Sequence, residues 1–285
     1  MTRGRDMSNI VNVALIQTCT PATAKAGLDH VAPMIRQAAL KGAELIITPE
    51  ATNFLEQRKG LRDATLVDES DDVAVQGLCK LAAELKVWIL MGSAMVRSNI
   101  DGDDRAANRS LLIDPTGTIV ARYDKMHVFD VDLDTGERWR ESAVVRPGSE
   151  AVVAPTPWGG LGLTICYDVR FAYLHRALAH GGASLIAVPA AFTRPTGEAH
   201  WEVLLRARAI ETGSYVLAPA QGGTHEDGRQ TWGQSVVISP WGEVIAKLDH
   251  DRPAVLHAQL DLSAVEKARR AIPALTHDRS FVTAQ

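Results

Sequence analysis

The sequence lacks the features that mark several special classes of protein. Its 285 residues include three cysteines, an odd number with no two close together, which disfavours a disulfide framework and a CxxC metal site. Nine histidines are present without the HExxH spacing of a metalloprotease. No hydrophobic run approaches the roughly 18 residues of a membrane-spanning helix. We therefore expect a protein without metal and without a membrane span.

The sequence also has no excess of positive charge. Thirty Lys and Arg against thirty-four Asp and Glu give a net charge of −4, whereas nucleic-acid binders usually carry a basic balance or stripe. Hydrophobic residues make up 46% and charged residues 22%, which is ordinary for a soluble globular protein. We expect partners that include neither nucleic acid nor a membrane.

The first residues carry no secretory signal. Residues 1–8 are mostly polar, and the apolar stretch at 10–16 is short and interrupted by Asn12, without a small-residue cleavage site. We predict a flexible lead-in at 1–8 and a single domain at 9–285, since no Pro/Gly/Ser-rich linker divides the rest. The unpaired cysteines fit a reduced, cytoplasmic compartment.

Apolar runs alternate with helix-periodic segments, which predicts an α/β fold with helix-covered sheets. Strands are expected at 11–17, 45–48, 87–92, 110–113, 118–123, 161–165, 183–188, 214–218, 236–238, 243–247 and 255–260. Helices are expected at 22–41 with a kink or restart at Pro33, from a cap at Ser70 or Asp71 to 86, at 170–180, at 198–212, and after a capping box of Ser263 and Glu266.

Two segments occur twice in similar form. Residues 42–49 (GAELIITP) match 182–189 (GASLIAVP), and residues 111–117 (LLIDPTG) match 236–242 (VVISPWG). The repeats are too few for a solenoid. They indicate two similar α/β halves, each with its own sheet.

Three reactive side chains follow predicted strands, where α/β folds bind ligands. They are Glu50, Lys125 and Cys166. Each alone has an ordinary explanation, as a solvated carboxylate, a surface ion pair and a buried thiol. Together they supply a base for the thiol proton, an ammonium that favours the thiolate and an oxyanion, and a nucleophile. The backbone N–H of Tyr167 would complete the oxyanion site.

These residues lie in segments that resemble the three signature segments of the nitrilase (carbon–nitrogen hydrolase) superfamily. The segments are TPE at 48–50, YDKMHVFD at 123–130 and LTICYDVRF at 163–171, in the family's order, and the match extends from 11 to 260. Residues 190–211 resemble the branch of deaminated-glutathione amidases and omega-amidases, and 220–225 lean toward the former. Segment 135–140 (TGERWR) is more charged than is typical of the family.

The resemblance implies a four-layer αββα sandwich that pairs through its helices into a homodimer or larger homo-oligomer. It also implies a Glu-Lys-Cys triad with Glu50 as general base, Lys125 as proton donor and oxyanion partner, and Cys166 as nucleophile. Glu141 matches the second glutamate, which orients the lysine and the substrate. No metal or organic cofactor is required.

The implied function is hydrolysis of a small linear non-peptide amide, deaminated-glutathione-like or an α-keto-acid amide, through a thioester with release of ammonia. An N-carbamoyl-amino-acid hydrolase and a nitrilase are alternatives, because the motifs fix the nucleophile and not the leaving group. A catalytically silent scaffold is the alternative from another class. Phe192, Thr193 and Arg194 are candidate substrate-binding residues, with Arg194 facing a substrate carboxylate.

Two other interpretations have less support. His127, His200 and His225 suggest a Cys–His set, but hydrogen-bonded structural histidines explain them better. The GGLG run at 159–162 precedes a strand instead of opening a helix, so it fails the dinucleotide-binding fingerprint. Cys19 and Cys79 are interpreted as packing residues.

Overall fold

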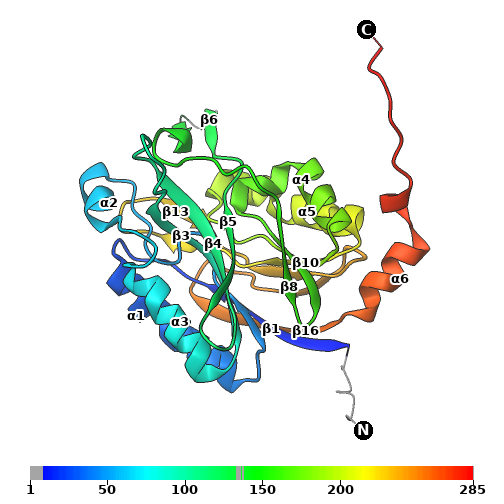
Figure 1. The fold of residues 1–285 in the computed structure, drawn as a ribbon, viewed down its shortest axis with the longest axis horizontal. Coiled ribbons are helices and arrows are strands. Elements are labelled where there is room, and N and C mark those ends of the chain that lie inside the picture. The colour runs from blue at the N-terminus through cyan, green and yellow to red at the C-terminus, as the bar shows by residue number, and fades with distance from the viewer. Residues whose placement is uncertain (1–8, 133–135, 137, 285) are drawn as a thin grey trace.

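The computed structural model describes residues 9–132, 136 and 138–284 (Figure 1). Two six-stranded sheets lie face to face, and helices cover the outer face of each sheet. The expected αββα sandwich is therefore confirmed. The lead-in expected at 1–8 lies outside the described residues.

The elements alternate along the chain much as the sequence indicates. The first sheet consists of β16 (Ala254–Asp261), β1 (Ile10–Gln17), β2 (Leu45–Ile47), β3 (Trp88–Arg97), β4 (Ala106–Ile113) and β5 (Ile119–Asp124), in that order. The second consists of β15 (Val244–Lys247), β14 (Val236–Ile238), β11 (Tyr215–Ala218), β10 (Ala183–Ala187), β9 (Gly159–Leu163) and β8 (Val152–Thr156). Two small ribbons pair β6 (Asp130–Asp132) with β7 (Arg138–Arg140), and β12 (Gly222–Thr224) with β13 (Gln230–Trp232).

The structure describes six α-helices. They are α1 (Ala24–Leu40), α2 (Lys59–Thr65), α3 (Val73–Leu85), α4 (Ala172–His180), α5 (Arg194–Thr212) and α6 (Ser263–Ala271), with 3₁₀ turns at Glu141–Ala143, Cys166–Arg170 and Ala274–Thr276. Figure 1 shows α1 and α3 on one side of the sheets and α4 and α5 on the other. None of the described helices, of which α5 is the longest, has the length and hydropathy of a membrane span.

The two sheets repeat one topology. In the first, β1, β2 and β3 run parallel, and β4 and β5 follow antiparallel. In the second, β9, β10 and β11 run parallel, and β14 and β15 follow antiparallel. The repeated sequence segments fall on equivalent elements, namely β2 and β10, and the hairpins β4–β5 and β14–β15. The predicted pair of similar halves, each with its own sheet, is confirmed.

Successive residues of the central strands face different layers, which explains why these strands are apolar throughout. In β1, Val13 and Leu15 contact the core between the sheets, while Ala14 and Ile16 pack under α1 and α3. Side chains from both sheets form one continuous core. On this basis we propose that residues 9–285 fold as one domain.

The helix starts differ from their predictions by one to four residues, and three of the differences have a visible cause. Asp72, not Ser70 or Asp71, caps α3 by accepting hydrogen bonds from two backbone N–H groups. The capping box predicted for α6 is wrong, because β16 continues to Asp261 and the chain turns only at Leu262, which makes Ser263 the first helical residue. Helix α5 begins four residues earlier than predicted, with Pro195 in its first turn.

Helix α1 touches the loop after β2 at a position with no room for a side chain. A Cβ on Gly27 would lie 2.0 Å from the carbonyl oxygen of Asn53. The Asn53 side chain exchanges two hydrogen bonds with the backbone of Met95 and donates a third to Asp72, all of 2.9 Å. This contact therefore fixes the loop that begins at Glu50.

We predict that Gly27→Ala destabilises the protein by about 1–3 kcal/mol, because the added methyl displaces the Asn53 carbonyl. The sign is opposite to the gain of up to about 1 kcal/mol expected for Gly→Ala in a helix. Urea unfolding followed by circular dichroism measures the difference. Gly60→Ala in α2 is the matched control, since nothing lies within 4 Å of its added Cβ. Equal effects of both substitutions would contradict the close contact.

Candidate active site

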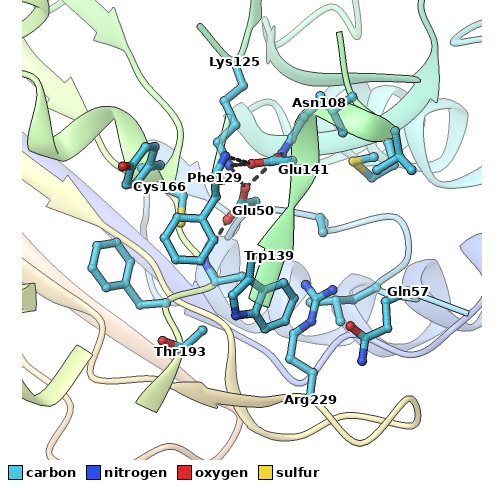
Figure 2. Close-up of a pocket in the computed structure, with 18 of the residues that line it drawn as sticks. Glu50, Gln57, Asn108, Lys125, Phe129, Trp139, Glu141, Cys166, Thr193 and Arg229 are labelled. Atoms are coloured by element: carbon cyan, nitrogen blue, oxygen red, sulfur yellow. Dashed lines mark hydrogen bonds and ion pairs between the residues drawn. The ribbon is translucent and has the colours of Figure 1, made fainter. Parts of the chain in front are cut away.

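Four side chains from both halves of the molecule meet at one end of the sandwich. Glu50 follows β2, Lys125 follows β5, Cys166 follows β9, and Glu141 begins the 3₁₀ turn after β7. Figure 2 shows their polar ends converging on one point. The structure thus brings together all four residues for which the sequence indicates a catalytic role.

The nucleophile candidate occupies an unusual backbone conformation. Cys166 has a φ of +50°, in the left-handed region that non-glycine residues rarely adopt. Its N–H donates to the carbonyl of Pro189 at 2.8 Å, and it starts the 3₁₀ turn that continues through Tyr167. N–H groups in the first turn of a helix have no intrahelical acceptor. The Tyr167 N–H is therefore a candidate donor to an oxyanion next to the thiol.

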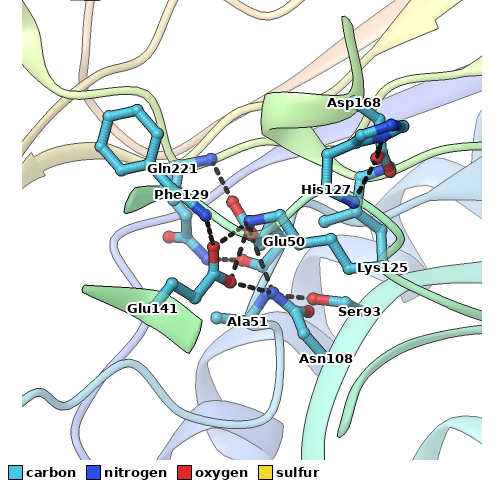
Figure 3. Close-up of polar contacts among 12 residues, drawn as sticks. Glu50, Ala51, Ser93, Asn108, Lys125, His127, Phe129, Glu141, Asp168 and Gln221 are labelled. Carbon is cyan, nitrogen blue, oxygen red and sulfur yellow. Dashed lines mark hydrogen bonds and ion pairs between the residues drawn. The ribbon is translucent and has the colours of Figure 1, made fainter. Parts of the chain in front are cut away.

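A buried carboxylate joins the lysine segment to the cysteine segment. Asp168 accepts hydrogen bonds from the Ile165 N–H (2.8 Å), the Tyr123 hydroxyl (2.6 Å), and both the N–H and Nδ1 of His127 (3.0 and 2.7 Å). Figure 3 shows the His127 and Asp168 pair beside the lysine. Asp168 of one signature segment thus binds Tyr123 and His127 of the other.

None of the three histidines considered as partners for the nucleophile lines its cavity. His127 bonds Asp168, His200 lies near the Arg170 guanidinium, and His225 bonds Thr231 and the Thr20 carbonyl. The interpretation of these residues as hydrogen-bonded structural histidines is confirmed.

Lys125 is almost completely buried between two carboxylates. Its Nζ lies 2.9 Å from Glu50 Oε1 and 2.9 and 2.8 Å from the two oxygens of Glu141. Burial alone would lower the pKa of the lysine, but the charges of Glu141 and Glu50 prevail and raise this pKa well above its usual value. Burial would likewise raise the pKa of Glu50, yet the Lys125 charge and hydrogen bonds hold it low. The resting site contains an ammonium and a Glu50 carboxylate.

Asn108 holds the two glutamates at a fixed separation, and the sequence did not predict this residue. Its amide nitrogen lies 2.9 Å from Glu50 Oε1 and 3.3 Å from Glu141 Oε1 (Figure 3). The backbone N–H groups of Ala191 and Phe129 donate to the remaining carboxylate oxygens at 2.9 and 2.6 Å. Asn108 is buried in β4, but this strand also contains Arg109 and Ser110, so no pattern in the sequence singles out the asparagine.

The thiol of Cys166 keeps its proton in the resting site. Burial raises the pKa of Cys166 well above its usual value, and the Glu50 carboxylate raises it further, while Lys125 acts in the opposite direction. The thiol also donates a hydrogen bond to Glu50, which helps to keep the pKa of that carboxyl low. The resting site thus contains a protonated thiol that is hydrogen-bonded to the Glu50 carboxylate.

The four side chains lie in a cavity of about 290 Å³. Its walls include five aromatic side chains, and its other charged groups are mostly arginines. These residues are Phe54, Phe129, Trp139, Tyr167, Phe192, Arg62, Arg138, Arg140, Arg170 and Arg229. Among the described residues, no group of three or more His, Cys, Asp or Glu could hold a metal ion.

The candidate substrate-binding residues divide into two groups. Phe192 and Thr193 line the cavity. Arg194 does not line it, and its guanidinium bonds Asp251 at 2.6 Å instead. Because α5 starts at this residue, Arg194 is fixed on the helix and lies outside the cavity wall. The sequence did not predict that Arg170, Arg229 and Trp139 line the cavity. The unusual charge of segment 135–140, which contains Trp139, was the available signal.

Comparison with known proteins finds similarity over most of the chain. The carbon–nitrogen hydrolase family profile matches residues 12–270. A deaminated glutathione amidase of Yersinia enterocolitica is 40% identical over 269 residues, 94% of this chain and 93% of that protein. The NitFhit protein of Caenorhabditis elegans has a TM-score of 0.85 at 35% identity, over 95% of this chain and 65% of that one. A mutant amidase of Nesterenkonia sp. AN1 with acrylamide added at its active-site cysteine has a TM-score of 0.76 at 26% identity, over 92% and 98% of the two chains.

We predict that Glu50→Gln lowers the pH at which Cys166 is half alkylated by iodoacetamide. The substitution removes the negative charge that raises the pKa of the thiol and leaves Lys125, which lowers it. Mass spectrometry of the Cys166 peptide across a pH series measures the midpoint. The Cys19 and Cys79 peptides of the same digest are internal controls whose midpoints should stay in place. A midpoint for Cys166 that is unchanged or higher would refute this electrostatic description.

Proposed function

The chain belongs to the carbon–nitrogen hydrolase family and hydrolyses amides, and we propose that Cys166 is its nucleophile and Glu50 its general base. The observation that carries this proposal is the contact of Lys125 with both glutamates at the floor of the cavity that contains the thiol. Base, electrostatic clamp and nucleophile stand in one enclosed space, as covalent catalysis requires.

The first half-reaction forms a thioester. The Cys166 sulfur attacks the amide carbon as its proton passes to Glu50, and the carbonyl oxygen becomes an oxyanion. Lys125 and the Tyr167 N–H stabilise this oxyanion. When the intermediate collapses, the carbon–nitrogen bond breaks and Glu50 returns the proton to the leaving nitrogen. Glu141 and Asn108 act through Lys125 and Glu50 by holding them in position.

The second half-reaction hydrolyses the thioester. Glu50, again a carboxylate, takes a proton from a water molecule that attacks the thioester carbon. The second oxyanion forms at the same donors. Its collapse breaks the carbon–sulfur bond, and the proton on Glu50 returns to the Cys166 sulfur. The acid product leaves and the resting site is restored.

We further propose a small linear substrate that is deaminated-glutathione-like or an α-keto-acid amide. The relative from Yersinia is named for deaminated glutathione, and Phe192 and Thr193 line a cavity close to the size of a small-molecule site. A primary amide would release ammonia. A secondary amide, such as one in a peptide-like substrate, would release an amine by the same steps.

We predict that Cys166→Ala abolishes release of ammonia or amine from a panel of α-keto-acid amides and deaminated glutathione. Lys125→Ala should lower kcat by at least about 100-fold, because the oxyanion loses its charged partner. A wild-type digest should contain the Cys166 peptide with the mass of the acyl group added. Lys247→Ala is the control, since this lysine pairs with Glu202 on the surface. Turnover that survives Cys166→Ala would refute the nucleophile.

We also propose a homodimer formed through the outer face of α5 and the elements beside it. Large apolar side chains are exposed there, with Ile210, Trp241 and Ile272 each more than half exposed around a hollow of about 280 Å³. The C-terminal segment extends away from the body of the molecule (Figure 1), and its Phe281 and Val282 are almost fully exposed. A second copy would cover both features.

We predict that light scattering during size exclusion gives twice the mass of one chain. Ile210→Glu should reduce it to the mass of one chain, because a charge is placed in the proposed interface. Leu40→Glu, on a residue that is exposed at the end of α1, should leave the assembly intact. A single-chain mass for the wild type would refute the dimer.

A cytoplasmic location is part of the proposal. All three cysteines are free in the structure. A nucleophilic thiol must remain reduced to act, and a reducing compartment preserves it.

A further inference from the structure

The cavity around Cys166 holds more positive charge than the proposed mechanism uses. Lys125 is paired with two glutamates on the cavity floor. Three of the lining arginines already have aspartate partners: Arg62 with Asp63, and Arg138 and Arg140 with Asp132. Within the described part of the chain, Arg170 has no ion pair, and the pair of Arg229 with Asp227, at 4.0 Å, is the longest that a lining arginine makes.

These two arginines differ in how their donors are occupied. Arg170 lies between the rings of Tyr167 and Phe192 and within 3.3 Å of the His200 ring nitrogen. Arg229, in the turn between β12 and β13, makes no side-chain hydrogen bond among the described residues, and its Nε is buried without a partner. Buried donors normally have partners, so an unpaired one in a cavity wall calls for a ligand.

The position of the Arg229 guanidinium is nevertheless fixed. Its Cζ lies over the ring of Trp139, 4.8 Å from the ring centre, in a cation–π contact that restrains it. Figure 2 shows Arg229 reaching toward Trp139 beside Gln57. The guanidinium is therefore oriented before any ligand arrives, and its loss of side-chain freedom on binding is small.

The nearest carboxylate cannot take the place of a ligand. Asp227 Oδ2 lies 4.0 Å from Arg229 Nε, beyond hydrogen-bond distance. Asp227 instead accepts the backbone N–H groups of Gln57 (3.0 Å) and Arg229 (2.9 Å), which ties the turn to the loop after Glu50. Asp227 therefore balances part of the Arg229 charge but leaves the guanidinium N–H groups free to donate to a ligand.

We propose that Arg229, positioned over the ring of Trp139, binds a carboxylate of the substrate that is remote from the amide bond cut at Cys166. A guanidinium presents a planar pair of N–H donors that matches a carboxylate in two-point contact. The inference rests on the proposed amide hydrolysis, whose reacting atoms lie on the floor of the same cavity. The substrate is thus a linear amide acid, with its carboxylate on either the acyl part or the amine part.

Three amides of similar size test the proposal and distinguish the two parts. Butyramide has no carboxylate, glutaramate carries one on its acyl part, and N-butyrylglycine carries one on its amine part. The measured quantity is the ratio of kcat/KM for each acid to kcat/KM for butyramide. We expect Arg229→Gln to lower one of the two ratios about 10- to 100-fold, the usual effect of losing hydrogen bonds to a charged group. Arg229→Lys should restore part of it.

Arg62→Gln is the matched control, because this arginine lines the cavity but is already paired with Asp63. It should leave both ratios in place. Ratios that are the same in wild type and Arg229→Gln, with release still dependent on Cys166, would overturn the carboxylate site and leave the proposed function standing.

A binding measurement tests the carboxylate site even if the enzyme hydrolyses none of the three amides. In Cys166→Ala, titration calorimetry should detect glutarate and not its neutral diamide. The binding should disappear in Cys166→Ala/Arg229→Gln and persist in Cys166→Ala/Arg62→Gln. Glutarate binding that is equal with and without Arg229 would refute the site independently of any turnover.

Discussion

The structure depends on one buried ammonium. Taking Lys125 out of water costs several kcal/mol unless opposite charges replace the lost hydration. Two glutamates supply that replacement, but they bring a net negative charge into the same buried space. The excess is offset by N–H donors, which come from Asn108 on β4 and from the backbone at Ala191 and Phe129. The lysine can therefore be buried only where segments of both halves meet.

Because the buried lysine needs groups from both halves, other polar side chains connect the two halves by hydrogen bonds. Gln221, which follows β11, donates to the carbonyl of Glu50 and accepts from Thr18 and Thr20 at the end of β1. Asp168 performs a similar task between the lysine and cysteine segments. Each group lies at the end of a strand whose position is set by the apolar core. The side chains of the proposed catalytic site are thus held by fixed neighbours, and such a site can stabilise an oxyanion without reorganisation during the reaction.

The sequence predicted the site residues that directly follow an apolar strand. It did not predict the site residues that lie inside a strand or in a turn. Glu50, Lys125 and Cys166 could be predicted because each follows a strand, and the repeated segments indicated the two sheets. Asn108 was missed because the strand was expected to begin at Ser110, although β4 already includes it. Arg229 lies in a turn, where only the folded chain shows that its donors lack partners.

The charges of the site favour one of the two roles implied for Lys125. The charges of Glu141 and Glu50 raise the pKa of the ammonium, which opposes loss of its proton, so in the proposed mechanism we assign it the role of a fixed charge. Ionising the thiol toward solvent would add a second net negative charge to a buried site that already carries one. Transfer to Glu50 leaves the total unchanged and places the negative charge on sulfur. As the carbon–sulfur bond forms, that charge moves to the carbonyl oxygen, where Lys125 can stabilise it. In the proposed mechanism the proton therefore travels between Cys166, Glu50 and the leaving nitrogen, while Lys125 stays charged.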